Sequence, residues 1–112
     1  MAHIKGDVTP ERRRLPQRRS AETFTLDSCG HTFTCTVGRF PDGSIGELFL
    51  SNKKSNQIGS MAADAAILAS ILIQMGVDLT TIRKSLMRDP VGQAMTPIGV
   101  ALDAIAEDEE RK

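Results

Sequence analysis

Three residues of the kinds that bind metal ions lie close together in the chain: Cys29, His31 and Cys35. Thiolate sulfur and imidazole nitrogen suit zinc, but a structural zinc site holds four such ligands in a tetrahedron. This group supplies three, and Cys35 alternates with threonines in the way typical of a half-buried strand. We therefore interpret Cys29 as a turn residue and Cys35 as a buried strand residue, and we expect no cofactor, zinc included. A metal site at the three residues is the alternative.

Two carboxylates stand among apolar neighbours and could take part in acid–base chemistry. Glu47 lies in a short apolar stretch, and Asp64 lies in the longest apolar run of the chain. Acid–base catalysis needs a partner group and a pocket, and no partner is spaced to serve either residue, so we predict no catalytic residue. Glu47 is expected to face solvent or to bind a backbone donor or an arginine. Because a buried carboxylate is costly unless paired, Asp64 is expected to cap a helix, to pair with Arg39 or Arg83, or to face water.

The N-terminal part of the chain is rich in arginine. Residues 1–19 contain six Lys or Arg residues and two Asp or Glu residues, and such a surplus suits contact with phosphate groups. The arginines concerned are Arg12, Arg13, Arg14, Arg18 and Arg19. A nucleic-acid or nucleotide binder is therefore an alternative function, although the chain has four Phe and neither Trp nor Tyr for base stacking.

Length and composition fit one small domain. The chain has 112 residues, 40% of them hydrophobic, and a formal net charge of zero. Residues 1–19 have no apolar periodicity and are expected to form a flexible basic arm, residues 20–107 a single domain, and residues 108–112 a charged tail. With two cysteines and no apolar segment of the signal-peptide kind near the N-terminus, a cytoplasmic location is expected.

The longest apolar run covers residues 61–75. About 20 apolar residues are needed to span a bilayer, whereas this run is shorter and contains polar residues. We interpret it as a buried helix of a globular domain, and we expect no contact with a membrane. Within it Ala62, Ala66 and Ser70 recur every four residues and predict a ridge of small side chains that another element can approach closely.

Periodicity and turn residues predict three strands followed by three helices. Apolar and polar residues alternate over 23–26 and 32–37 around a turn at 27–30, which predicts an antiparallel hairpin. A Pro-Asp-Gly turn precedes a third strand over 45–51, either covered on both sides or lying at an edge packed by a helix. Helices are expected over residues 58–75, from 79 to the Asp89-Pro90 pair, and over 97–105. Strands followed by helices favour an α+β fold, a three-stranded antiparallel sheet with the helices packed on one face.

With these elements placed, residues 20–105 resemble the TSCPD domain, which is found at the C-terminal end of adenosylcobalamin-dependent ribonucleotide reductases and in stand-alone proteins. The resemblance rests on Cys29-Gly30 before a strand, the turn at 40–43, the stretch 46–50, the apolar helix, and Gly76-Val77 after it. The positions that carry the family pattern are Cys29, Gly30, Asp42, Gly43, Glu47, Phe49, Asp64 and Gly76.

The chain departs from this family where the family carries its cysteines. The resemblance implies several cysteines thought to bind metal, whereas residues 96–103 contain none and only Cys29 remains. The large reductase barrel, its radical-generating cysteine and its cobalamin site cannot fit in 112 residues. The resemblance therefore implies a non-catalytic, stand-alone accessory domain. It would act through protein contacts or self-association, by its sheet edge or its small-residue helix, with a ribonucleotide reductase as a candidate partner.

Overall fold

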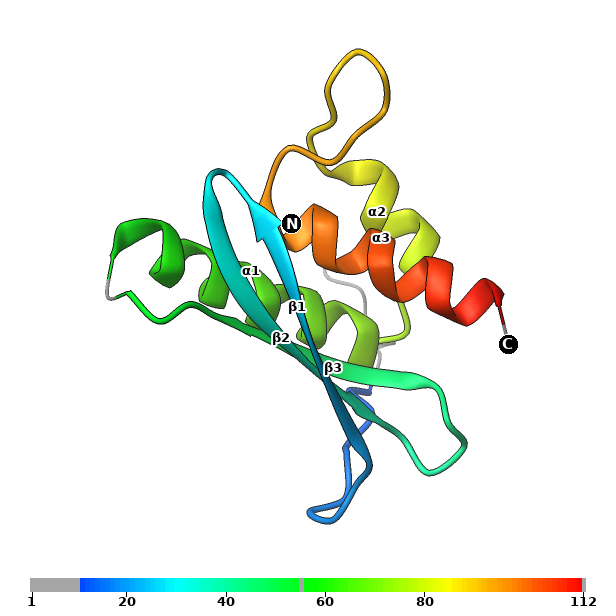
Figure 1. Cartoon of the computed structure of the whole chain (residues 1–112). Helices are drawn as coiled ribbons and strands as arrows, with labels where there is room; N and C mark the ends of the chain where they lie inside the picture. The colour runs from blue at the N-terminus through cyan, green and yellow to red at the C-terminus, as the bar shows by residue number, and fades with distance from the viewer. Residues whose placement is uncertain (1–10, 55, 112) are drawn as a thin grey trace, which may run out of the picture.

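Three strands followed by three helices make up the protein, in a computed structural model that describes residues 11–54 and 56–111. The strands are β1 (Ala21–Ser28), β2 (His31–Arg39) and β3 (Ile45–Ser51). The helices are α1 (Gln57–Gln74), α2 (Leu79–Ser85) and α3 (Pro97–Glu110). This arrangement confirms the predicted α+β fold (Figure 1).

The sheet is antiparallel throughout, with β2 between β1 and β3. Strands β1 and β2 join through a tight turn at Cys29 and Gly30, whose φ angles are both positive, at 54° and 77°. The register places Leu26 opposite Phe33, and both side chains are buried. Because side chains alternate along a strand, the apolar residues share the face that the helices cover. The threonines between them share the other face, which is largely exposed.

Strand β3 is an edge strand packed by helix α1, which is the second of the two predicted alternatives. Ala62, Ala66 and Ser70 are all buried in this contact, which confirms the small-residue ridge. The Ser70 hydroxyl accepts a hydrogen bond from the N–H of Leu48 at 2.9 Å. It can donate its one hydrogen either to the Leu48 carbonyl at 2.9 Å or to the Ala66 carbonyl at 2.8 Å. The ridge therefore brings the helix close enough to bond directly to the strand backbone.

Helices α2 and α3 complete the layer on the same face of the sheet. Helix α3 packs on β1, and α2 packs on α3, with Ile82 and Leu102 entering the core. The side chains of Asp78 and Thr96 cap the two helices by accepting a hydrogen bond from the N–H three residues further on. The two helices therefore begin at residues 79 and 97, where the sequence predicts.

Helix α2 ends at Ser85, earlier than the Asp89-Pro90 stop that the sequence predicts. Leu86 is already extended, with φ of −91° and ψ of 160°, and the Asp89 carboxylate accepts hydrogen bonds from two backbone N–H groups that follow it. A side chain that bonds to nearby backbone in this way competes with a helix. Residues 86–96 instead form a loop closed by an isolated β-bridge, and it projects beyond the helices (Figure 1).

Helix α1 is long and apolar enough, by length and composition alone, to cross a membrane, with a mean hydropathy of 1.3 over 18 residues. The core helix of a globular domain meets the same criterion, and 33% of this helix is buried inside the domain. The prediction of a buried helix is correct for one side only. The other side faces away from the sheet and carries exposed Met61 and Leu68.

Candidate functional site

The three residues of metal-ligand type do not converge. Cys35 is fully buried in β2, and burial raises the pKa of its thiol to about 12. Cys29 is exposed at the β1–β2 turn, where its sulfur lies 3.5 Å from the Met95 carbonyl oxygen. The ring of His31 stands edge-on to Phe33, with 6.5 Å between the ring centroids. Among the described residues, no group of three His, Cys, Asp or Glu side chains is placed to hold a metal ion.

The two carboxylates of the apolar stretches occupy different environments. Glu47 is only 8% exposed, and its Oε2 accepts a hydrogen bond from Nε of Arg19 at 2.5 Å. Of the three environments predicted for Glu47, the structure shows the one in which it binds an arginine. Asp64 is exposed on α1 and faces water. The structure therefore does not bring the two carboxylates into a common cleft.

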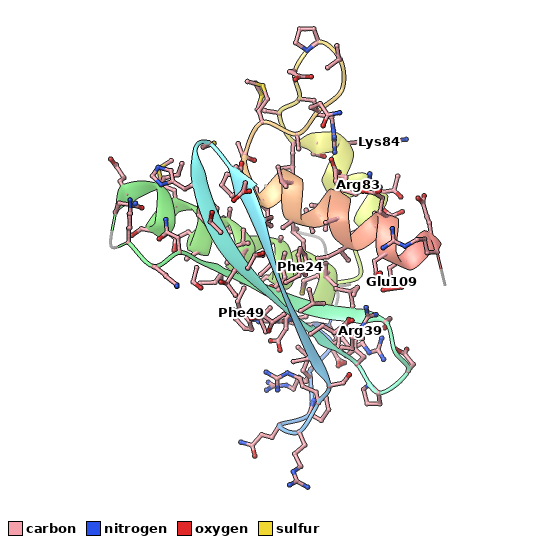
Figure 2. The ribbon with its side chains drawn as sticks, in the orientation of Figure 1. Phe24, Arg39, Phe49, Arg83, Lys84 and Glu109 are labelled. Carbon is pink, nitrogen blue, oxygen red and sulfur yellow. The ribbon has the colours of Figure 1, made fainter. Side chains whose placement is uncertain are left out.

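Arg39 and Arg83, the predicted partners of the α1 carboxylate, pair with other acidic residues. Arg39 lies 2.6 Å from Glu22 and 2.7 Å from Glu109, so it joins β1 and β2 to the last turns of α3 (Figure 2). Arg83 lies 2.9 Å from Asp103 and joins α2 to α3. Both arginines therefore connect elements of the fold.

Residues 11–19, the described part of the predicted arm, lie against the domain, and we call this segment the strap. The N–H of Arg13 donates to the carbonyl of Gln74 at 2.7 Å, and Nε of Arg12 donates to the Gln74 side chain at 2.6 Å. Gln74 in turn donates to the carbonyl of Gly46 at 2.8 Å. The end of a helix leaves carbonyl groups without partners, and the strap supplies donors there. The sequence analysis did not predict this role of Gln74. The one feature that could have indicated it is a polar side chain near the end of an apolar run.

The strap also covers part of the β3 edge. The guanidinium of Arg13 lies 3.7 Å from the centre of the Phe40 ring and 3.0 Å from Asp42. Leu15 occupies the space that a side chain at Gly46 would fill, since a Cβ there would lie 2.5 Å from Leu15. Sequence reasoning missed Leu15 because it stands alone among polar residues. Covering an edge strand also protects it from pairing with other chains.

The five arginines predicted to contact phosphate differ in their surroundings. Arg14 and Arg18 are exposed, and neither forms a side-chain hydrogen bond or ion pair with residues 11–54 or 56–111. Arg19 is committed to Glu47 and to the Pro16 carbonyl. Residues 1–10 of the predicted arm lie outside the described residues.

The outer side of α1 carries an apolar stripe that extends to the helix C-cap; Met61, Leu68 and Leu72 in it are exposed, and its other two members are half-buried. Its members are Met61, Ala65, Leu68, Leu72 and Met75, and we call them the α1 stripe. Intervals of four and three residues alternate along it, which is the heptad spacing by which two helices pack side by side. Met61 and Leu68 are each 63% exposed, and Leu72 is 43% exposed. Sequence reasoning assigned the whole run to the core, because a helix that is apolar on both sides has no polar face to mark the outer one.

Loop 86–96 carries a second group of exposed apolar side chains: Met87, Val91 and Met95. Arg88 fixes the base of the loop through hydrogen bonds to Asp103 at 2.7 and 2.8 Å and to the Gly92 carbonyl at 3.0 Å. Hydrogen bonds from Arg88 and then from Arg83 hold the pKa of Asp103 below its ordinary value. The loop is thus tied to both α2 and α3.

The family model of the TSCPD domain matches residues 6–107. This chain belongs to the TSCPD domain family. The match includes the strap as well as the sheet and most of α3, so the segment that the sequence assigned to an arm lies within the family domain.

Three relatives of this TSCPD domain each bear the name vitamin B12-dependent ribonucleotide reductase. The protein from Rhodopirellula baltica is 36% identical over 74 residues, which are 65% of this chain and 7% of the relative. Those from Agrobacterium fabrum and Bradyrhizobium diazoefficiens are 37% and 33% identical over 73 residues, which are 64% of this chain and 6% of each relative. The chain therefore spans a small fraction of the relatives' length. No solved structure matches it.

The positions that carry the TSCPD pattern mainly shape turns and edges. Gly43 and Gly76 have positive φ angles of 89° and 95°, a conformation that favours glycine. Asp42 accepts hydrogen bonds from the hydroxyl and the N–H of Ser44, and these bonds, with one from the strap, lower its pKa to about 2. Phe49 is 46% exposed on the outer face of the sheet. These positions therefore shape turns and the surface of the sheet.

Proposed function

We propose that this TSCPD domain is a non-catalytic interaction domain that associates through the α1 stripe. The observation that carries the proposal is the exposure of Met61, Leu68 and Leu72 at heptad spacing. The opposite side of α1 is already covered by β3, so the small-residue ridge is not available to a partner. A contiguous row of large apolar side chains in water is typical of an interaction surface.

A second copy of the chain is the occupant that the stripe fits best. The stripe extends over residues 61–75, about 21 Å of helix at 1.5 Å per residue, and two copies offer each other the same length and the same apolar character. Asp64 is the one charged residue of α1, and the whole chain has a formal net charge of zero. Little electrostatic repulsion therefore opposes the pairing of two copies.

The size of the stripe leads us to expect weak association. Fully burying one large aliphatic side chain contributes roughly 1.5–3 kcal/mol, whereas bringing two proteins together costs roughly 4–15 kcal/mol. Three large side chains per copy, each already partly covered, contribute a free energy of about the same size as that cost. We therefore expect a reversible dimer, which a larger partner with additional contacts could replace.

Cross-linking through one introduced cysteine tests this proposal. In a Cys29→Ser background the remaining thiol, Cys35, is buried, and L68C places a new thiol at the centre of the stripe. A two-fold axis through the stripe brings this position in each copy close to the same position in the other, so mild oxidation should yield a disulfide-linked dimer. M87C, equally exposed in loop 86–96, is the matched control. Equal dimer yields from L68C and M87C would contradict the proposal.

A vitamin B12-dependent ribonucleotide reductase is the alternative occupant of the stripe, because the relatives bear this name and are far longer than the match. Capture of the reductase by the wild-type chain but not by the L68E variant would replace the second copy with this partner. The proposal includes a cytoplasmic location and the absence of a catalytic role.

A further inference from the structure

A groove of about 560 Å³ lies beside the strap and contains more arginines than carboxylates. Arg12, Arg14 and Arg19 line it, with Glu47 and Gln74. Arg19 is neutralised by Glu47, with which it forms an ion pair. Arg12 donates to the uncharged amide of Gln74, and Arg14 forms no hydrogen bond or ion pair within residues 11–54 and 56–111. Two guanidinium charges therefore lie in one groove without a carboxylate bound to either.

The position of Arg12 is fixed before any ligand arrives. Its Nε donates to Oε1 of Gln74 at 2.6 Å, and the Gln74 side chain is buried and itself donates to the Gly46 carbonyl at 2.8 Å. This leaves the two terminal nitrogens of Arg12 without a partner among the described residues. A side chain that is already held in place loses less conformational entropy when it binds an anion.

We propose that this groove binds a small oligophosphate anion between Arg12 and Arg14, either inorganic tripolyphosphate or the phosphate chain of a nucleoside triphosphate. A guanidinium is planar and donates pairs of parallel hydrogen bonds to phosphate oxygens. The Cα atoms of residues two apart lie at most about 7 Å from each other. Two guanidinium groups this close together can bind neighbouring phosphate groups of one short chain, as an oligophosphate supplies.

A short phosphate chain suits the groove better than a nucleic-acid strand. Nucleic-acid strands are held by stacking on aromatic rings as well as by cations, and no aromatic side chain lines this groove. Of the predicted phosphate contacts, Arg13 and Arg19 are already engaged by Asp42 and Glu47. The nucleobase of a nucleoside triphosphate is accordingly expected to add little affinity.

Calorimetric titration of the full chain with sodium tripolyphosphate tests the proposal. Arg14→Gln removes one of the two cations and should weaken binding about tenfold, the effect of losing a charge-assisted hydrogen bond. Arg18→Gln is the matched control, because Arg18 lies on the same strap and is equally without a partner but does not line the groove. Glu11→Gln removes a lining carboxylate and should tighten binding.

The remaining arms of the titration identify the ligand class. ATP should bind about as tightly as tripolyphosphate, and adenosine should not bind. The proposal is overturned if tripolyphosphate gives no heat, if R18Q weakens binding as much as R14Q, or if a single-stranded oligonucleotide or a poly-glutamate peptide binds more tightly than tripolyphosphate. Because the Arg14 side chain forms no hydrogen bond or ion pair with the described residues, R14Q should melt at the wild-type temperature, which circular dichroism verifies.

Discussion

Three buried polar side chains hold strand β3 in place, each through its own hydrogen bonds. The hydroxyl of Ser70 meets the backbone of β3, the amide of Gln74 links β3 to the strap, and the carboxylate of Glu47 binds an arginine across the outer face of the sheet. All three side chains are buried. A buried polar group is costly when it lacks its partner, so each of these residues should be more sensitive to substitution than its size implies.

Ser70→Ala should lower the free energy of unfolding by about 1–3 kcal/mol, because it leaves a buried N–H of β3 without its acceptor. Ser85→Ala is the matched control. Ser85 also donates to the carbonyl four residues earlier, at 2.8 Å, but it is exposed on α2 and contacts no strand. Urea unfolding followed by circular dichroism measures both variants. Similar losses from the two serines would refute the role assigned to the β3 contact.

Arg19→Ala should destabilise the domain by about 1–2 kcal/mol, because it leaves the carboxylate of Glu47 buried without a cation. Arg18→Ala, one residue away and without an internal partner among the described residues, should change the free energy of unfolding by less than about 0.5 kcal/mol. Adding Glu47→Gln to the Arg19 variant should recover part of the loss, since it removes the unpaired charge. A double variant as unstable as the sum of the two single variants would show that the two residues do not interact.

At the scale of secondary-structure elements, ion pairs between arginines and carboxylates join neighbouring helices and strands. Helix α2 and loop 86–96 are tied to α3 through Asp103, which binds both Arg83 and Arg88. The far end of α3 is tied to the sheet through Arg39. These contacts compensate for the small apolar area that short elements such as the 7-residue α2 can bury. The stability of this half of the domain should therefore depend on the charge of Asp103.

Lowering the pH should weaken the connection of α2 to α3. The pKa of Asp103 is lower in the folded chain than the value near 3.9 of an unfolded aspartate, so its contribution to stability is complete above that value and is lost as the pH falls through the folded pKa. Asp103→Asn should cost about 1 kcal/mol at neutral pH. It should also reduce the acid dependence of the free energy of unfolding below about pH 5.

The control for this pH series is Asp64→Asn. Asp64 is exposed on α1 and has no cation within hydrogen-bonding distance among the described residues, so this variant should follow the wild-type curve. Unfolding in urea at a series of pH values supplies the data. An Asp103 variant whose acid dependence equals that of the wild type would contradict the account.

Local patterns predict the architecture of the whole molecule better than they predict its surface. The order of strands and helices follows from alternation with a period of two, from turn residues such as Gly43, and from the caps at Asp78 and Thr96. The position of the strap could not be predicted, because it depends on contacts such as that of Arg12 with Gln74, 62 residues away. The division of the domain at residue 20 stays a prediction.

The candidate site was hidden in the sequence for a different reason. Composition identifies α1 as an apolar helix but does not say which of its sides the rest of the chain covers. The small residues of the ridge face β3, so the larger side chains of the α1 stripe lie on the side of the helix that is exposed to solvent. The residue types suited to metal binding serve the fold instead, since Cys35 belongs to the core and Cys29 to a turn.

The molar mass of the full chain over a concentration series tests the central claim most directly. We predict that light scattering will show a rise from 12.1 kDa towards twice that mass as the concentration increases. The L68E variant should stay at the mass of the single chain, and M87E, with the same change at an equally exposed site, should follow the wild type. A wild-type chain that stays at 12.1 kDa at every concentration, or equal effects of L68E and M87E, would contradict association through the α1 stripe.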